Sequence, residues 1–343
     1  MKNLTVKFAT VLLAGACAAA LAASCDKDQK LDKSDAPTSL KISFSSITKA
    51  KGSGHGDAAK DKKVNTLQLY SFNSDGSLDN YHSMSGQDVS DSYTMEVTAG
   101  QKEVWAVANS HDVAAFASVK SLDQLKSLTF SLAKEDTTNF SMVDSAKASV
   151  TKGATAQVTV NMRRTVARVL LESIKTDFST GYQDVELKNV KAYLLNVNSL
   201  AAVGDSKGKE PMVNKAENKP ADYASYVMPE MLCHDVEGNI GKTAREINQY
   251  FYCYSNDNST AVTKLIIQAD LNGKTYYYPI VITDNASAEV PSGVKANMAY
   301  KVCNVIITRP GATTPDGMIE YGSIKFTIEV DDWDYWDCGE YRF

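Results

Sequence analysis

The sequence predicts an all-β protein with minor α content, built as two antiparallel β-sandwich domains. Short runs of alternating apolar and polar residues recur along the chain, turn residues separate them, and 43% of the 343 residues are hydrophobic, an ordinary globular share. The length allows two domains, each with its own core. The net charge of −5, with no basic block, argues against nucleic acid as a partner.

The first 24 residues have the pattern of a secretory signal peptide. Lys2 and Lys7 precede an apolar run over residues 8–23, which is shorter than the roughly 20 residues of a membrane-spanning helix. The run ends in LAASC at residues 21–25, which resembles the lipobox of bacterial lipoproteins and implies lipidation of Cys25. Cys17 is the competing position, and a plain signal peptide with a chance cysteine is the alternative.

The next segment combines a tether, a strand and a loop. Residues 26–37 are polar and are interpreted as a tether. Leu40, Ile42 and Phe44 alternate with polar residues, which predicts a half-buried strand. Residues 49–56 are Gly-rich and contain Lys49 and Lys51, so they are predicted to form a loop that a protease can cut.

The body of the chain is predicted to hold many short strands. The expected ranges are 64–72, 93–97, 103–108, 157–162, 166–174, 185–197, 264–271, 274–283, 299–308 and 323–330. Asn272-Gly273 predicts a tight hairpin between two of them. One helix is expected over residues 113–125 and a long surface loop over 205–221. The domain boundary is expected where Arg163, Arg164 and Arg168 interrupt two apolar runs; a solvated basic strip is the alternative reading of these arginines.

Several landmarks follow one another in a specific order. They are the lipobox ending at Cys25, the strand 40–44 before a basic cut site, TAGQKEVWAVAN at 98–109, FSM at 140–142, VARV at 166–169, IITRPG at 306–311 and VDDW at 330–333. This order resembles the fimbrillin family of Bacteroidia, the lipoprotein pilins of type V pili. The resemblance runs essentially from end to end.

The resemblance implies a mechanism of assembly. Such pilins reach the cell surface as lipidated precursors, and a trypsin-like protease then removes the segment through the first strand. The C-terminal segment of another subunit fills the groove that is left, which is strand addition. The best-known fimbrillins are cut after arginine, but this chain has none before Arg163, so the expected cut follows Lys49 or Lys51.

The resemblance also implies the domain organisation. Residues 1–24 are the signal peptide, 25–51 the lipidated propeptide with the removable strand, 52–165 the N-terminal sandwich, 166–332 the C-terminal sandwich and 333–343 the donor segment. Leu40, Ile42 and Phe44 would occupy the groove in the precursor. The donor segment holds Trp333, Tyr335, Trp336, Tyr341 and Phe343. The alternative for this segment is an ordinary final strand on its own domain.

Other side chains give no sign of catalysis or of a cofactor. Cys233, Cys253, Cys303 and Cys338 remain after removal of the signal and lipidation, and are predicted to be either disulfides or free buried thiols. A disulfide at Cys338 would pin the tail to its own subunit. The histidines are scattered without metal-ligand spacing. No catalytic residue, metal or cofactor is therefore expected.

We interpret the chain as a structural subunit of surface fimbriae that polymerises with copies of itself and other fimbrial subunits. The precursor would be held at the outer membrane by its lipid, and no adhesion target is predicted. One alternative is a tip or anchor subunit. Another is a glycan-binding surface lipoprotein, for which Tyr276-Tyr277-Tyr278, Trp105 and Trp336 could supply stacking rings.

Overall fold

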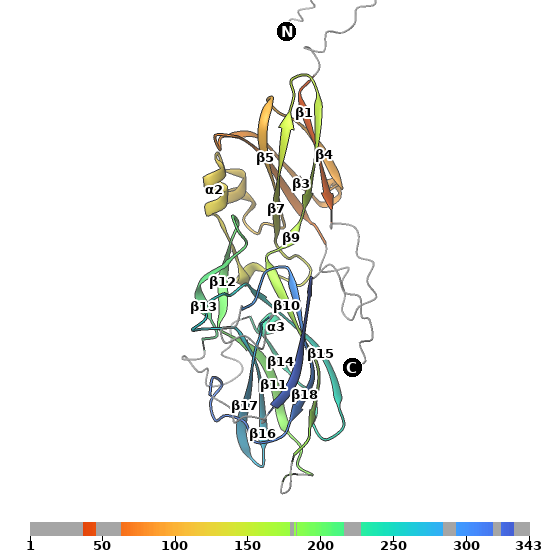
Figure 1. Cartoon of the computed structure of the whole chain (residues 1–343), viewed down its shortest axis with the longest axis vertical. Coiled ribbons are helices and arrows are strands. Elements are labelled where there is room, and N and C mark those ends of the chain that lie inside the picture. Colours follow the sequence, from red (N-terminus) through yellow and green to blue (C-terminus); the bar gives the residue numbers. More distant parts are fainter. Residues whose placement is uncertain are drawn as a thin grey trace, which may run out of the picture.

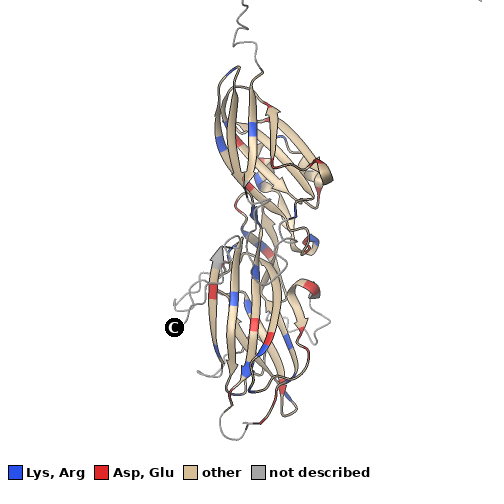
Figure 2. Ribbon diagram, turned by 90° about the vertical axis from the view of Figure 1, so that its right-hand side faces the viewer, with Lys and Arg blue, Asp and Glu red and all other residues tan. Residues whose placement is uncertain are grey.

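The computed structural model describes residues 37–45, 63–178, 182, 184–215, 228–283, 293–317 and 324–332. Within these ranges the chain forms an elongated molecule with two β-rich parts stacked along its long axis (Figure 1). Basic and acidic residues are interspersed along the ribbon of both parts (Figure 2). No helix in the described ranges is long and apolar enough to cross a membrane.

The first part, here called the upper sandwich, pairs a five-stranded sheet of order β3-β2-β5-β7-β9 with a three-stranded sheet of order β4-β1-β8. Its strands are β1 (Ser39–Ser45), β2 (Thr66–Asn73), β3 (Leu78–Ser85), β4 (Ser92–Glu96), β5 (Gly100–Ala108), β7 (Met142–Val150), β8 (Thr155–Asn161) and β9 (Arg163–Arg164). Neighbouring strands are antiparallel except β1 and β8, which are parallel. The first strand of the chain thus lies in the middle of a sheet.

The second part, the lower sandwich, consists of two four-stranded sheets of order β15-β10-β18-β19 and β14-β11-β16-β17. Its strands are β10 (Val166–Thr176), β11 (Lys188–Leu195), β14 (Cys233–Asp235), β15 (Arg245–Tyr254), β16 (Lys264–Leu271), β17 (Lys274–Val281), β18 (Met298–Ile307) and β19 (Ile324–Asp332). The short helix α3 (Pro229–Leu232) packs beside β14 and β15. Only the β10–β18 pair is parallel.

A small third sheet of order β13-β12-β6 connects the two sandwiches. It combines β6 (Thr129–Ser131) with β12 (Val197–Ala202) and β13 (Gly208–Val213), which come from opposite sides of the expected domain boundary. Two short α-helices, α1 (Val113–Ala117) and α2 (Leu122–Ser127), and two 3-10 turns, η2 (Gly86–Asp88) and η3 (Leu132–Lys134), complete the described elements.

The buried apolar side chains form two clusters. The smaller fills the space between the two sheets of the upper sandwich and includes Leu69 of β2. The larger begins with Tyr70 and Trp105 on the other face of the five-stranded sheet and continues through the lower sandwich. Successive residues of a strand point to opposite faces, so the central strands of this sheet are buried on both sides.

Most predicted strands are present within a few residues of their expected ends. The strands β3, β7, β12 and β15 are among those that were not expected. LDNYHSMS of β3 is mostly polar, and MVDSAKASV of β7 has large apolar residues only at its two ends. The expected hairpin is also present. Asn272 and Gly273 both have positive φ, 51° and 77°, as a two-residue primed turn requires.

Two expectations about the irregular regions were wrong. The single helix over 113–125 is two short helices, each beginning at its own cap: Asp112 accepts from the Ala115 amide and Ser121 from the Gln124 amide. The loop over 205–221 contains β13, which pairs with β12; residues 216–221 lie outside the described ranges. Tertiary pairing here overrides a polar sequence.

The chain passes from the five-stranded sheet to the lower sandwich between Arg164 and Val166. Arg163 is exposed and forms an ion pair with Asp144, with 3.2 Å between Nε and Oδ2. Arg164 and Arg168 are buried, and the Arg168 guanidinium lies 5.4 Å from the centre of the Tyr250 ring. The three arginines are therefore not a solvated strip.

A buried carboxylate ties the two sandwiches together. Glu135, which is 6% exposed, accepts a 2.8 Å hydrogen bond from the Tyr254 hydroxyl of β15 and a 2.9 Å bond from the Ser141 amide. His111 Nε2 lies 3.6 Å from Oε2 of Glu135, the oxygen that accepts from the Ser141 amide. Burial first, and then the nearby Glu135 charge, hold the pKa of Tyr254 well above its usual range, so its hydroxyl keeps its proton and donates.

Replacing Tyr254 by Phe should lower the free energy of unfolding by about 1.5–3 kcal/mol, because it removes a hydrogen bond to a buried charged acceptor. Urea denaturation measures the loss. Tyr276→Phe, on a half-buried ring of β17, is the control and should stay within about 0.5 kcal/mol. Equal effects of the two substitutions would contradict a stabilising role for the Glu135–Tyr254 bond.

Candidate functional site

The candidate site is the position that β1 occupies in the three-stranded sheet. Its residues pair with β4 on one edge, where Leu40 faces Met95 and Ile42 faces Tyr93. On the other edge Ile42 faces Val158 of β8. A strand from the start of the chain is thus inserted between two strands from later in the upper sandwich.

The apolar side chains of β1 complete the smaller core. Leu40 and Ile42 are fully buried and Phe44 is 7% exposed, whereas Lys41 on the opposite face is exposed. Burying each of these three side chains contributes about 1.5–3 kcal/mol. The predicted alternation is confirmed, but its apolar face is more deeply buried than in a half-buried strand at the edge of a sheet.

Polar contacts fix the register of β1 at both ends. Thr38 accepts from the Val97 amide through its carbonyl and from the Gly153 amide through its hydroxyl, at 3.1 and 2.9 Å. At the other end, the Phe44 amide donates to the Asp91 carbonyl at 3.0 Å. Because the side chains of a strand alternate between faces, a one-residue slip would turn the apolar set out of the core.

Without β1 the upper sandwich would be incomplete. The inner edges of β4 and β8 would expose unpaired backbone groups, and the side chains around Leu40, Ile42 and Phe44 would line an open apolar groove. Another strand with large apolar residues at alternate positions could pair with both edges and fill this groove.

The strand directions show which end of β1, and so of the groove, lies next to the lower sandwich. β8 runs parallel to β1 and ends at Asn161, directly before β9 and the lower sandwich. The Ser45 end of β1 therefore lies beside the junction between the sandwiches, and its Ser39 end lies near the top of the molecule (Figure 1). The predicted cut sites Lys49 and Lys51 follow the junction end and lie outside the described residues, as does Cys25.

The strand before the predicted donor segment also ends at the junction. β10 starts there at Val166, β18 runs parallel to it, and β19 runs antiparallel to β18, with Asp332 opposite Met298. Residues 333–343 thus begin near the middle of the molecule. Trp333, Tyr335, Trp336, Tyr341 and Phe343 lie outside the described residues.

The structure separates three of the predicted cysteines. Cys233, Cys253 and Cys303 are buried free thiols, which is the second of the two alternatives given for these three. Burial raises the pKa of Cys253 and Cys303 to about 12, which leaves both protonated and unreactive at neutral pH. Cys338 lies outside the described residues, and its pairing stays a prediction.

The rings that could have stacked on a sugar are largely covered. Trp105 is 4% exposed and Tyr278 is fully buried. The ammonium of Lys274 lies 5.1 Å from the centre of the Tyr276 ring, over its face. This arrangement gives the glycan-binding interpretation little support, because a sugar needs an open aromatic face.

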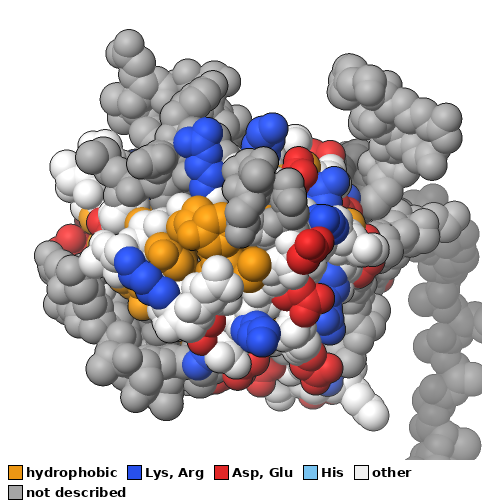
Figure 3. Space-filling view, turned by 90° about the horizontal axis from the view of Figure 1, so that it is seen from below, with side chains coloured by type: hydrophobic (Ala, Val, Ile, Leu, Met, Phe, Trp, Pro, Cys, Tyr) orange, Lys and Arg blue, Asp and Glu red, His pale blue; other side chains and the backbone are white. Residues whose placement is uncertain are grey.

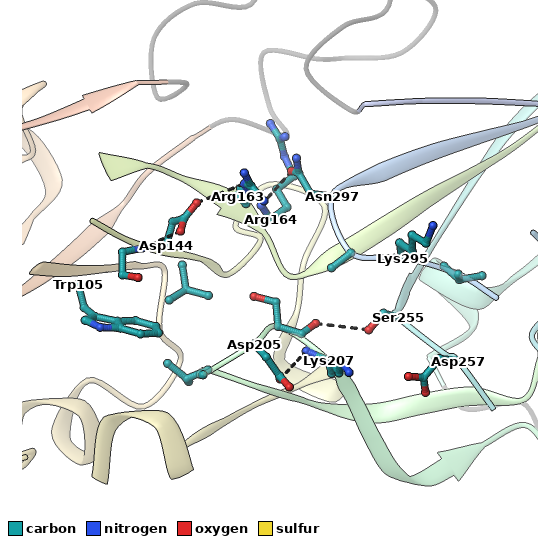
Figure 4. A pocket seen from close by; sticks show the side chains of 17 residues that line it. Trp105, Asp144, Arg163, Arg164, Asp205, Lys207, Ser255, Asp257, Lys295 and Asn297 are labelled. Atoms are coloured by element: carbon teal, nitrogen blue, oxygen red, sulfur yellow. Dashed lines mark hydrogen bonds and ion pairs between the residues drawn. The ribbon is translucent and has the colours of Figure 1, made fainter. Parts of the chain in front are cut away.

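A cavity of about 440 Å³ lies at the junction (Figure 4). Its apolar lining includes Trp105, Val143, Val203, Val294 and Ala296. Charged side chains of both signs also line it, namely Asp144, Arg163, Arg164, Asp205, Lys207, Asp257 and Lys295. Sequence reasoning missed this site, because its walls come from six separate segments that only the tertiary structure brings together. Within the described ranges, no group of His, Cys, Asp and Glu side chains is placed to hold a metal.

Comparison with known families places the chain. A family model described as "Major fimbrial subunit protein (FimA)" matches residues 36–219, more than half of the chain and including β1 and the whole upper sandwich. The chain belongs to this family. It is therefore a fimbrial structural subunit, and its family is one of cell-surface fimbriae. No curated protein matches it significantly.

Solved structures share the fold of this fimbrial subunit. A fimbrilin from Porphyromonas gingivalis is 15% identical, with a TM-score of 0.64 over 87% of this chain and 98% of its own. A candidate cell adhesion protein from Bacteroides eggerthii is 22% identical, with a TM-score of 0.63 over 87% and 96%. A tip fimbrial protein from Porphyromonas gingivalis is 16% identical, with a TM-score of 0.51 over 86% and 99%. The predicted fimbrillin-type fold is confirmed.

Substituting Ile42 by Ala should lower the free energy of unfolding by about 2–5 kcal/mol, because the cavity it leaves is closed on both sides by β4 and β8. Urea denaturation of the chain from Asp26 onward measures this. Lys41→Ala, one residue away on the exposed face, should change stability by no more than about 0.5 kcal/mol. If the two variants unfold alike, β1 is not an integral part of the core in solution.

Proposed function

We propose that this fimbrial subunit is exported as a lipoprotein acylated at Cys25, cut after Lys49 or Lys51, and polymerised by strand addition into the groove that β1 vacates. The observation that carries the proposal is β1 itself. It is a central, fully paired strand with a buried apolar face, yet it is joined to the rest of the upper sandwich only through residues 46–62. A cut in that segment turns a covalent strand into an exchangeable one.

Lipid at Cys25 would tether the precursor to the outer membrane through residues 26–36, which lead into β1. The cut would release the mature subunit from this tether as soon as β1 leaves, so release from the membrane and opening of the groove would be one event. Other copies of the chain and other fimbrial subunits are the proposed partners. We propose no adhesion target, because no site among the described residues indicates one.

The donor segment is proposed to be residues 333–343, with β19 leaving its sheet together with it. Eleven extended residues reach at most about 36 Å, and β10, which spans the lower sandwich, is itself about 36 Å long. A tail that starts at Asp332 would reach no farther than the lower end of its own subunit. If β19 is released as well, the extended donor begins at Ile324, at that lower end, and can reach beyond its own subunit.

The side chains of β19 suit this role. Ile324, Phe326, Ile328 and Val330 repeat at the same two-residue spacing as the apolar residues of β1. All four remain half-buried at the edge of the lower sandwich, so they would gain burial in a closed groove. The lower end also presents a group of hydrophobic side chains surrounded by charged ones (Figure 3), as an end-to-end contact between subunits would need.

Brief treatment of the chain from Asp26 onward with a lysine-cutting protease should yield a ladder of oligomers on an unboiled SDS gel. N-terminal sequencing should find Ala50 or Gly52, and would separate these cuts from ones at Lys60, Lys62 or Lys63. Deleting residues 333–343 should leave a folded monomer that forms no ladder. Normal ladders from this truncation would refute the donor assignment, and a clean cut that yields only monomer would instead favour a tip or anchor subunit.

A disulfide that locks β19 to β18 tests the release of β19. Cys303 is a free thiol directly opposite Thr327, so Thr327→Cys can form a cross-strand disulfide. We expect the oxidised variant to be cut but not to form a ladder, and to form one after reduction. Thr327→Ser is the matched control. Ladder formation by the oxidised variant would mean that residues 333–343 act alone.

A further inference from the structure

We propose that, in the uncut precursor, the aromatic start of the C-terminal tail docks into the junction cavity of its own subunit. This inference rests on the proposed function only for its consequence, a latch on the donor before assembly. The occupant is residues 333–336, which hold Trp333, Tyr335 and Trp336. The cavity, its walls and the point where the tail begins are all set by described residues.

The tail begins beside the wall of the cavity. Asp332 pairs with Met298, and the four residues before Met298 line the cavity. Asn297 holds this wall against the upper sandwich, since its side-chain oxygen accepts from the Arg164 amide at 3.0 Å and its own amide donates to the Val166 carbonyl at 3.0 Å. Four extended residues reach about 14 Å, enough to carry a ring past this wall.

The cavity has the chemistry of a site for an aromatic side chain. Val143, Val203 and Val294 line it, and so does the indole of Trp105 (Figure 4). A volume of about 440 Å³ lies in the range of sites that hold compact organic groups, so one or two rings could enter. Burying one large ring contributes about 1.5–3 kcal/mol, enough to hold a tethered segment.

Charged side chains of both signs line the cavity, and cationic ones are among those exposed there. Lys207 is exposed, and Arg163, paired with Asp144 at 3.2 Å, projects from β9 with 67% of its side chain exposed. The tail brings Asp334 and Asp337 on either side of its first aromatic group. Opposite charges at the rim add orientation, each pair contributing about 0.2–1 kcal/mol.

Docking would hold the tail and, through it, the end of β19. The same rings cannot fill the subunit's own cavity and the groove of another subunit at once. A subunit whose tail is docked in its own cavity therefore keeps its donor occupied. The donor is given up only when an open groove offers greater burial, which disfavours premature exchange between precursors.

Hydrogen exchange of the uncut monomer tests the docking. Backbone amides of residues 333–337 should exchange at least about tenfold more slowly in the unmodified chain than in Lys207→Trp, whose new ring covers the cavity. Lys209→Trp is the matched control, because Lys209 is an exposed lysine two residues away that does not line the cavity. It should leave the protection unchanged.

Cysteine trapping gives a second readout that does not depend on how well a Trp variant folds. Lys207→Cys should form an intramolecular disulfide with the native Cys338 under mild oxidation, and Lys209→Cys should form it much more slowly. Unprotected tail amides in the unmodified chain would overturn the proposal, as would equal trapping at the two positions. Protection that vanishes on dilution would also overturn it, because the occupant would then be another subunit's tail.

The tests of tail docking and of polymerisation can fail independently of each other. An unprotected tail together with normal ladders after cutting would remove the latch and leave strand addition intact. A protected tail with no ladder would leave the latch and remove the proposed function.

Discussion

The structure depends on one constraint: the three-stranded sheet of the upper sandwich is closed by a strand from the far N-terminus. β1 is hydrogen-bonded on both edges and its apolar face completes the smaller core. A sheet with a missing central strand exposes two edges and an apolar groove, which is costly in water. Removing β1 would therefore cost the upper sandwich both its backbone pairing and part of its core.

The second organising feature is the junction. β10 and β18 run parallel away from it and β19 runs back towards it, so the Ser45 end of β1, the cavity and the end of β19 all meet in the middle of the molecule. Glu135 and Tyr254 hold the two sandwiches together there through a buried, charge-assisted hydrogen bond. The end of β1 and the end of β19 thus lie at the same junction.

Sequence patterns predicted the elements that repeat a simple rule. Leu40, Ile42 and Phe44 predicted β1 because they alternate with polar residues. Asn272-Gly273 predicted the hairpin between β16 and β17 because both residues readily adopt positive φ. The alternation rule missed β3, β7 and β13. These segments are strands because neighbouring strands supply their backbone hydrogen bonds. The sequence pattern also merged α1 and α2, since an apolar spacing of three residues persists across two separately capped turns.

By itself the sequence predicted the class of the protein: a β-rich chain with the pattern of a signal peptide, an alternating first strand and an aromatic tail, in an order that resembles one family. These features are local or linear, so they can be read without coordinates. Only the tertiary structure decided that β1 lies between β4 and β8, that Cys233, Cys253 and Cys303 are buried free thiols, and that a cavity opens beside Asn297. The physical reason is that each of these depends on pairings between residues far apart in the chain, which strand periodicity does not encode.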